Sequence, residues 1–114
     1  MSRQASGLRA WALQRISAAY LGLYLIYMLG HLSFNAPETF EAWRTYVADP
    51  GVTFGMLLFV VALLIHAWVG IRDVLIDYVH PITARVGLLS LFAIGLIGCG
   101  LWFAQTIFLA SVAA

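Results

Sequence analysis

The sequence predicts an all-α membrane protein with three transmembrane helices, and both its composition and its apolar segments indicate this class. Of its 114 residues, 63% are hydrophobic and 10% are charged, whereas a soluble domain carries about 25% charged residues. A membrane-spanning helix needs about 20 mainly apolar residues. Three segments meet this requirement, at residues 16–34, 52–71 and 86–110. We expect residues 1–114 to form a single membrane domain with few internal contacts, which needs a partner chain.

The arginines predict how the chain is oriented in the membrane. Cytoplasmic segments carry an excess of Lys and Arg, and this chain has no lysine. The N-terminal segment contains Arg3, Arg9 and Arg15, and the second loop contains Arg72 and Arg85. The first loop contains one arginine, Arg44, together with three acidic residues, Glu38, Glu41 and Asp49. We expect the N-terminus and residues 72–85 in the cytoplasm, and the C-terminus on the periplasmic side.

Charge and span number argue against two other classes of protein. A formal net charge of +1 does not attract nucleic acid. A small multidrug transporter has a similar length, but it would need a fourth span and an acidic residue in mid-membrane. Here the acidic residues all lie in predicted loops. The single cysteine, Cys99, supports no disulfide framework.

The first span carries a polar and aromatic stripe at helical spacing. We expect this stripe to be the packed face of the helix, because polar groups in lipid turn toward the interior of a bundle. On the same span, Ala18 and Gly22 form a small-residue pair that permits the close approach of another helix. The stripe comprises Ser17, Tyr20, Tyr24, Tyr27 and His31.

Two segments indicate a structural role and contain no candidate catalytic or binding residues. The loop between residues 35 and 51 contains a stretch with helical spacing, from Phe40 to Val47, which we expect to form a short helix on the outer surface. The third span is rich in glycine, and small residues in membrane helices allow close packing.

The second span and the loop after it hold the densest group of ionisable residues in the chain. His66 lies inside the apolar segment, and Gly70 lies one turn later on the same face, where it leaves room for a flat group. If the helix continues past the membrane, Asp73 and Asp77 extend this face until Pro81 ends it. Ionisable groups are costly in hydrocarbon, so such a cluster at one membrane face indicates function.

His66 has three interpretations. It can be a packing residue that hydrogen-bonds to a neighbouring helix, a ligand of haem iron through a neutral imidazole nitrogen, or a proton-relay residue. If it ligates haem, the second ligand must lie at the same depth. His66 lies roughly 9 Å from the cytoplasmic boundary and His31 roughly 24 Å from it, by the helical rise. Because His80 lies outside the apolar segment, the second ligand would come from another chain.

The residues from His66 to Pro81 also carry a family resemblance. The run His-Ala-Trp-Val-Gly at residues 66–70, the Asp-Tyr-Val of residues 77–79 and Pro81 closely resemble the small hydrophobic membrane anchor of bacterial succinate dehydrogenase, respiratory complex II. The start of the first span around Arg15, the stretch at residues 23–28, the three-span layout and the length are also similar. The resemblance is weakest in the first loop and the third span.

The resemblance implies an oxidoreductase subunit of the inner membrane, in the respiratory chain and the tricarboxylic acid cycle. It implies that His66 ligates haem b, shared with a second anchor subunit, and that Arg15 lies near a haem propionate. Tyr78 and Asp77 match residues of the ubiquinone-reduction site. A flavoprotein, an iron–sulphur subunit and lipid are the other implied partners. Alternatives are a fumarate reductase anchor and a structural anchor without cofactor.

Four residues depart from the family pattern and receive no assigned role. His31 stands where an apolar residue is expected, and His80 stands where a lysine is common. Arg72 and Asp73 replace uncharged residues. They either form a surface pair or alter access to the quinone pocket.

Overall fold

The computed structural model describes residues 3–113, with side chains from residue 7 to residue 112, and its backbone is almost entirely helical. The four helices are α1 (Arg3–Phe34), α2 (Phe40–Ala48), α3 (Pro50–Tyr78) and α4 (Ile82–Ala113). Three of them are long and apolar enough to cross a membrane, over Gly7–Phe34, Pro50–Tyr78 and Ile82–Val112. The prediction of an all-α chain with three spans is confirmed, and each predicted span lies within one of these helices.

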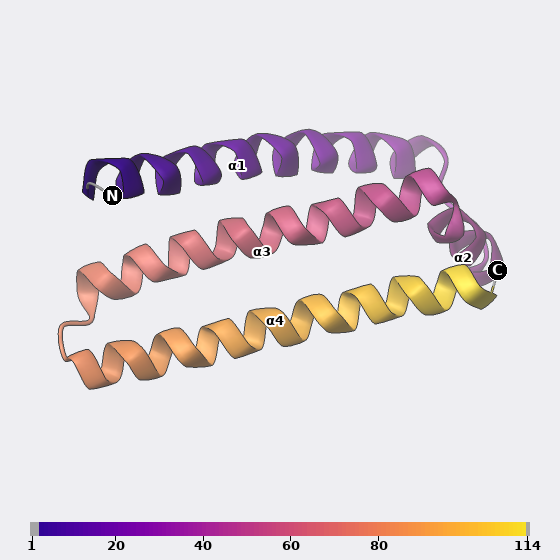
Figure 1. The fold of residues 1–114 in the computed structure, drawn as a ribbon. Coiled ribbons are helices and arrows are strands. Elements are labelled where there is room, and N and C mark those ends of the chain that lie inside the picture. The colour runs from indigo at the N-terminus through magenta and orange to yellow at the C-terminus, as the bar shows by residue number, and fades with distance from the viewer. Residues whose placement is uncertain (1–2, 114) are drawn as a thin grey trace.

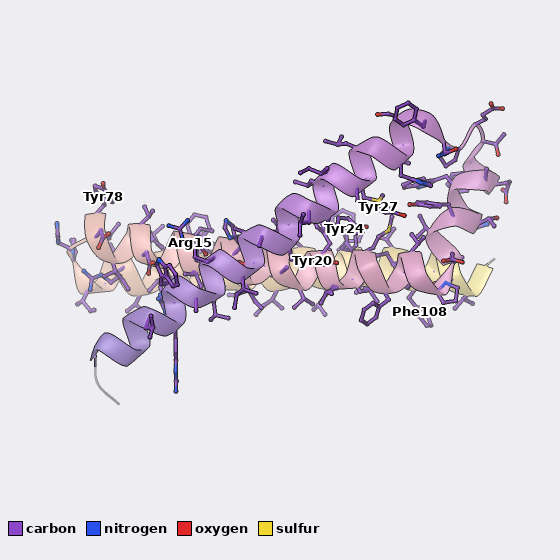
Figure 2. All side chains as sticks on the ribbon, turned by 90° about the horizontal axis from the view of Figure 1, so that it is seen from above. Arg15, Tyr20, Tyr24, Tyr27, Tyr78 and Phe108 are labelled. Carbon is purple, nitrogen blue, oxygen red and sulfur yellow. The ribbon has the colours of Figure 1, made fainter. Side chains whose placement is uncertain are left out.

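The three long helices form a row with α3 in the middle (Figure 1). Helix α3 packs against both α1 and α4, and among the described residues α1 and α4 make no direct backbone contact. Helix α4 runs alongside α3, whereas α1 crosses α3 obliquely (Figure 2). The longest dimension is 50 Å, which exceeds the hydrocarbon thickness of about 30 Å. The two termini lie at opposite ends of the row.

The short helix α2 covers the end of the row opposite to Tyr78, and we call this the α2 end. Thr39 caps α2, since its Oγ1 accepts a hydrogen bond from the amide of Ala42 at 3.0 Å. Asp49 then joins α2 to α3. Its amide donates to the carbonyl of Tyr46, and its carboxylate accepts from the amide of Val52 at 3.3 Å. The predicted short helix is therefore confirmed, as a segment capped at both ends.

At the other end of the row, which we call the Tyr78 end, a tight turn joins α3 to α4. Helix α3 continues to Tyr78, and Pro81 follows shortly after it, as the sequence predicted. Arg85 of α4 reaches back to this turn and donates hydrogen bonds to the carbonyls of Val79 at 3.0 Å and Ile76 at 3.2 Å. A cation at a helix C-terminus satisfies free carbonyls and complements the helix dipole, so Arg85 stabilises the end of α3.

The row of helices has a small core. Between residues 7 and 112 seven residues are buried, and a large set of apolar side chains on α1, α3 and α4 is exposed. An extensive exposed apolar surface suits a chain that is surrounded by lipid and by other subunits. The buried residues are Ser17, Leu21, Val47, Met56, Val69, Leu75 and Ile107.

The small residues of the spans differ in whether another helix approaches them. Ala18 and Gly22 are both exposed, and a Cβ added at Gly22 would meet no atom within 4 Å. The close approach expected there is thus not made within this chain, because α3 packs on a different face of α1. Gly100 of α4 lies directly against Leu64 of α3, where an added Cβ would come within 2.6 Å of a Leu64 methyl carbon.

Candidate functional site

His66 lies on α3 and is joined to α1 by a hydrogen bond. Its Nδ1 is 3.1 Å from the hydroxyl oxygen of Ser17. Ser17 is only 6% exposed, and its hydroxyl also donates to the carbonyl of Gln14 at 3.2 Å. The interhelical hydrogen bond that the packing interpretation predicts is therefore present. It uses one nitrogen of the imidazole, and the other has no hydrogen-bond partner among the described residues.

The face of α3 beside His66 is closely covered by α1. A Cβ added at Gly70 would lie 3.5 Å from the side-chain nitrogen of Gln14, and the side-chain oxygen of Gln14 is buried without a hydrogen-bond partner in the described part of the chain. The sequence predicted room for a flat group beside Gly70. An added Cβ would make only an ordinary van der Waals contact with the end of the Gln14 side chain, so this stays a prediction.

Arg15 lies near the crossing of α1 and α3 (Figure 2), two residues before Ser17. The axial offset between these two residues is about 3 Å by the helical rise, so Arg15 and His66 lie at similar depth. The guanidinium carbon of Arg15 is 5.7 Å from the centre of the Trp11 ring. Within the described residues Arg15 forms no ion pair and no hydrogen bond to His66, which leaves its charge available to an anionic group.

Asp77 and Tyr78 are the last two residues of α3, and both are exposed. The Tyr78 side chain is 78% exposed and projects from the end of the helix (Figure 2). Twelve residues separate it from His66, which corresponds to about 18 Å along the helix axis. The structure thus places His66 and Tyr78 on one helix but does not bring them into contact.

Arg72 and Asp73 form an ion pair on the surface of α3. The guanidinium nitrogen lies 3.2 Å from the carboxylate, with the two side chains 38% and 53% exposed. Of the two roles that the sequence left open, the surface pair is the one observed. Exposed pairs of this kind contribute about 0–1 kcal/mol to stability.

His31 lies at the α2 end, far from His66. Its ring stacks on Tyr46 of α2, with centroids 5.1 Å apart, and on Tyr27 at 6.0 Å. Tyr46 in turn donates a hydrogen bond to the sulphur of Met28, and burial raises the pKa of its phenol. His31 therefore helps to fasten α2 to α1. Fourteen residues separate it from Ser17, about 21 Å along α1, so His31 and His66 do not face one site.

The remaining members of the predicted stripe on α1 mostly face α3. The Tyr20 hydroxyl donates to the carbonyl of Gly55 at 2.9 Å, and the ring of Tyr24 stacks on Phe59 with centroids 4.8 Å apart. Tyr27 departs from the prediction, since it is 61% exposed. Figure 2 shows the three tyrosines along α1, from its crossing with α3 toward α2.

Helical spacing placed Ser17 on the packed face without a chemical role. Its position near the same membrane boundary as His66 was the signal that could have indicated a contact between them. Ser17 follows the membrane boundary at Arg15 by two residues, and His66 precedes the boundary at Arg72 by six. Two polar side chains at similar depth on neighbouring antiparallel helices are candidates for a hydrogen bond.

The residues near His66 fit one axial position of a haem. In the part of the chain that the structure describes, no group of three or more His, Cys, Asp or Glu residues could hold a metal ion. A haem iron, in contrast, takes a single side chain on each face. An imidazole with one nitrogen anchored and the other unpartnered meets this requirement.

Three membrane-spanning helices and a group of polar residues toward one end of them define a small multi-pass membrane protein. Comparison with known proteins gives the family. The sequence matches the family described as "Succinate dehydrogenase/Fumarate reductase transmembrane subunit" over residues 1–113, and the chain belongs to this family.

One curated relative is a succinate dehydrogenase hydrophobic membrane anchor subunit from Coxiella burnetii (strain RSA 493 / Nine Mile phase I). The two sequences are 27% identical over 104 residues, which cover 91% of this chain and 90% of the relative. The resemblance found in the residues from His66 to Pro81 is thereby confirmed at the level of the family.

Proposed function

We propose that this chain is the hydrophobic membrane anchor of a succinate:quinone oxidoreductase in the bacterial inner membrane. In this role it holds a flavoprotein and an iron–sulphur subunit at the membrane, shares haem b with a second anchor subunit, and contributes to the quinone-reduction site. The observation that carries the proposal is the placement of His66. It lies inside the second span, with Nδ1 3.1 Å from a hydroxyl of the neighbouring helix and its other nitrogen unpartnered among the described residues.

His66 and Arg15 are the residues that would hold the haem. His66 would supply an imidazole nitrogen to the haem iron, and the Arg15 guanidinium would pair with a propionate carboxylate. His31 stacks on Tyr46 at the α2 end, which supports a second haem ligand from the partner anchor rather than from this chain. When bound, the haem would supply a reversible one-electron store.

Tyr78 and Asp77 would form this chain's part of the quinone site. Reduction of a quinone to a quinol takes two electrons and two protons. The Tyr78 phenol donates a hydrogen bond to a quinone carbonyl, which stabilises the negative charge that develops on that oxygen. Asp77 is exposed beside it and links the site to water. Electrons would arrive from the iron–sulphur subunit, docked at the Tyr78 end, and the arginine distribution supports a cytoplasmic location for that end.

The relative supports one direction of the reaction. The family includes transmembrane subunits of both succinate dehydrogenase and fumarate reductase. The relative from Coxiella burnetii is a succinate dehydrogenase anchor, which favours succinate oxidation over fumarate reduction as the physiological direction.

The test is a reduced-minus-oxidised optical spectrum of the purified complex, with mass spectrometry of the chains that copurify. We expect a b-type haem signal with a flavoprotein, an iron–sulphur protein and a second small anchor. The variant His66→Ala should lose the haem signal, while His80→Ala, at an exposed histidine in the turn after α3, should keep it. Unchanged haem content in His66→Ala would contradict the ligand assignment. A complex that contains the partner chains but no haem would support only the role as a membrane anchor.

A further inference from the structure

The hydrogen bond between Ser17 and His66 determines which imidazole nitrogen is free. A neutral imidazole carries one proton, either on Nδ1 or on Nε2, and only the nitrogen without a proton has a lone pair for a metal. Nδ1 lies 3.1 Å from the Ser17 oxygen. The position of the proton in this contact therefore decides whether Nε2 can act as a ligand.

Ser17 has a second hydrogen-bond partner that favours one direction. Its hydroxyl donates to the carbonyl of Gln14, three residues earlier on α1, at 3.2 Å. Serine in a helix commonly donates to a carbonyl of the preceding turn, and a hydroxyl has one proton to donate. With that proton directed at Gln14, the proton in the contact with His66 belongs to Nδ1. Nε2 then carries the lone pair.

We propose that Ser17 is a positioning residue for the haem-ligand site, an inference that rests on the proposed role of His66. Ser17 accepts the Nδ1 proton of His66, holds the ring in one tautomer and one orientation, and leaves Nε2 as the ligand nitrogen. The chain of donors runs from His66 Nδ1 to the Ser17 hydroxyl and on to the carbonyl of Gln14.

The surroundings of Ser17 strengthen this hydrogen bond. Ser17 is buried, and the groove of about 290 Å³ that it lines between α1 and α3 is otherwise formed by apolar side chains and the ring of Tyr20, whose hydroxyl is engaged with Gly55. In such surroundings a hydrogen bond is electrostatically stronger than in water. No competing side-chain partner for the Ser17 hydroxyl is present among the described residues.

A second effect of this hydrogen bond concerns the reduction potential of the haem. A hydrogen bond from the outer nitrogen of a ligating histidine increases the basicity of the ligand nitrogen. A more basic ligand favours the oxidised iron, so Ser17 lowers the reduction potential of the haem. Loss of the acceptor should raise that potential. A residue that only fills space between α1 and α3 would leave it unchanged.

The test compares three variants of the purified complex by optical redox titration and by electron paramagnetic resonance of the oxidised haem. Ser17→Ala removes the acceptor, and Ser17→Thr retains a hydroxyl on the same carbon. Ser33→Ala is the matched control, because the Ser33 hydroxyl donates to the carbonyl of Leu29 on the exposed side of α1. At the ambient potential where the wild-type haem is half reduced, Ser17→Ala should raise the ratio of reduced to oxidised haem by about two- to tenfold, the effect of one hydrogen bond.

Ser17→Thr and Ser33→Ala should match the wild type in both measurements. An unchanged potential and an unchanged resonance signal in Ser17→Ala would overturn the role of Ser17 while leaving His66 as the ligand. If Ser17→Ala does not assemble, Ser17→Cys replaces it, since a thiol is a weak acceptor; a potential equal to that of Ser17→Thr would overturn the inference. A wild-type complex without haem would overturn both the inference and the proposed ligand.

Discussion

The contact between Gly100 and Leu64 makes the packing of α3 against α4 sensitive to a single methyl group. A Cβ added at Gly100 would lie 2.6 Å from one methyl carbon of Leu64 and 3.7 Å from its Cγ. The first distance is far shorter than the separation of about 3.5–4.0 Å at which carbon atoms attract. Gly100→Ala therefore requires the Leu64 side chain to move.

Two opposing contributions set the size of the effect. An extra methylene in a packed interface costs about 1–3 kcal/mol, whereas replacing glycine with alanine inside a helix gains about 0.8–1 kcal/mol. Leu64 can move at its flexible end, because it borders a groove of about 270 Å³ between α3 and α4. The low end of the packing cost then applies. We expect Gly100→Ala to leave the free energy of unfolding nearly unchanged. A glycine-to-alanine variant in open space should be about 1 kcal/mol more stable than Gly100→Ala.

Gly98 on α4 supplies the matched control, because a Cβ added there meets nothing within 4 Å. Each change is combined with Leu64→Ala, and the free energy of unfolding of the complex is measured by titration with a denaturing detergent. We expect a favourable coupling of about 1 kcal/mol between Gly100→Ala and Leu64→Ala, since the truncated side chain makes room. The Gly98 pair should show no coupling. Equal coupling energies in the two pairs would refute the packing argument.

Two further predictions concern the Tyr78 end. Tyr78→Phe removes the hydroxyl proposed to polarise the quinone, so quinone reduction should fall at least tenfold while electron transfer from succinate to a soluble artificial acceptor is retained. Equal losses in both assays would show that Tyr78 has a structural role. Tyr27→Phe at the α2 end is the control. Arg85→Ala removes the hydrogen bonds to the carbonyls of Val79 and Ile76, so quinone reduction should fall with haem content unchanged and hydrogen exchange at residues 76–82 should increase. Exchange equal to that of the wild type would show that the turn does not depend on Arg85.

Much of the fold was predictable because its determinants are local. Apolar length identified the three spans, and helical spacing from Phe40 to Val47 identified α2. Pro81 set the limit beyond which α3 could not extend. Apolar length alone did not give the ends of the helices. The apolar segment stops at residue 71, but the helix continues to Tyr78, since polar residues extend a helix as readily as apolar ones.

The parts of the site that depend on how helices cross were not predictable from spacing. The side chain nearest to Gly70 is that of Gln14, and the pair Ala18 and Gly22 faces away from α3. Both outcomes follow from the oblique crossing of α1 (Figure 2), which places the residues near Ser17 on α3. A periodic pattern identifies the packed face of a helix, but not the angle at which that face meets its neighbour.

The arrangement of the long helices in a row, with α3 between α1 and α4, has a consequence for how changes combine. The α1–α3 interface at Ser17 and the α3–α4 interface at Gly100 lie on the same helix, α3, but involve different neighbouring helices. In the described chain α1 and α4 make no backbone contact. Stability effects at separate interfaces are expected to add. Substitutions at one of these interfaces therefore need no compensating substitution at the other, whereas the sequence of α3 is constrained by both interfaces.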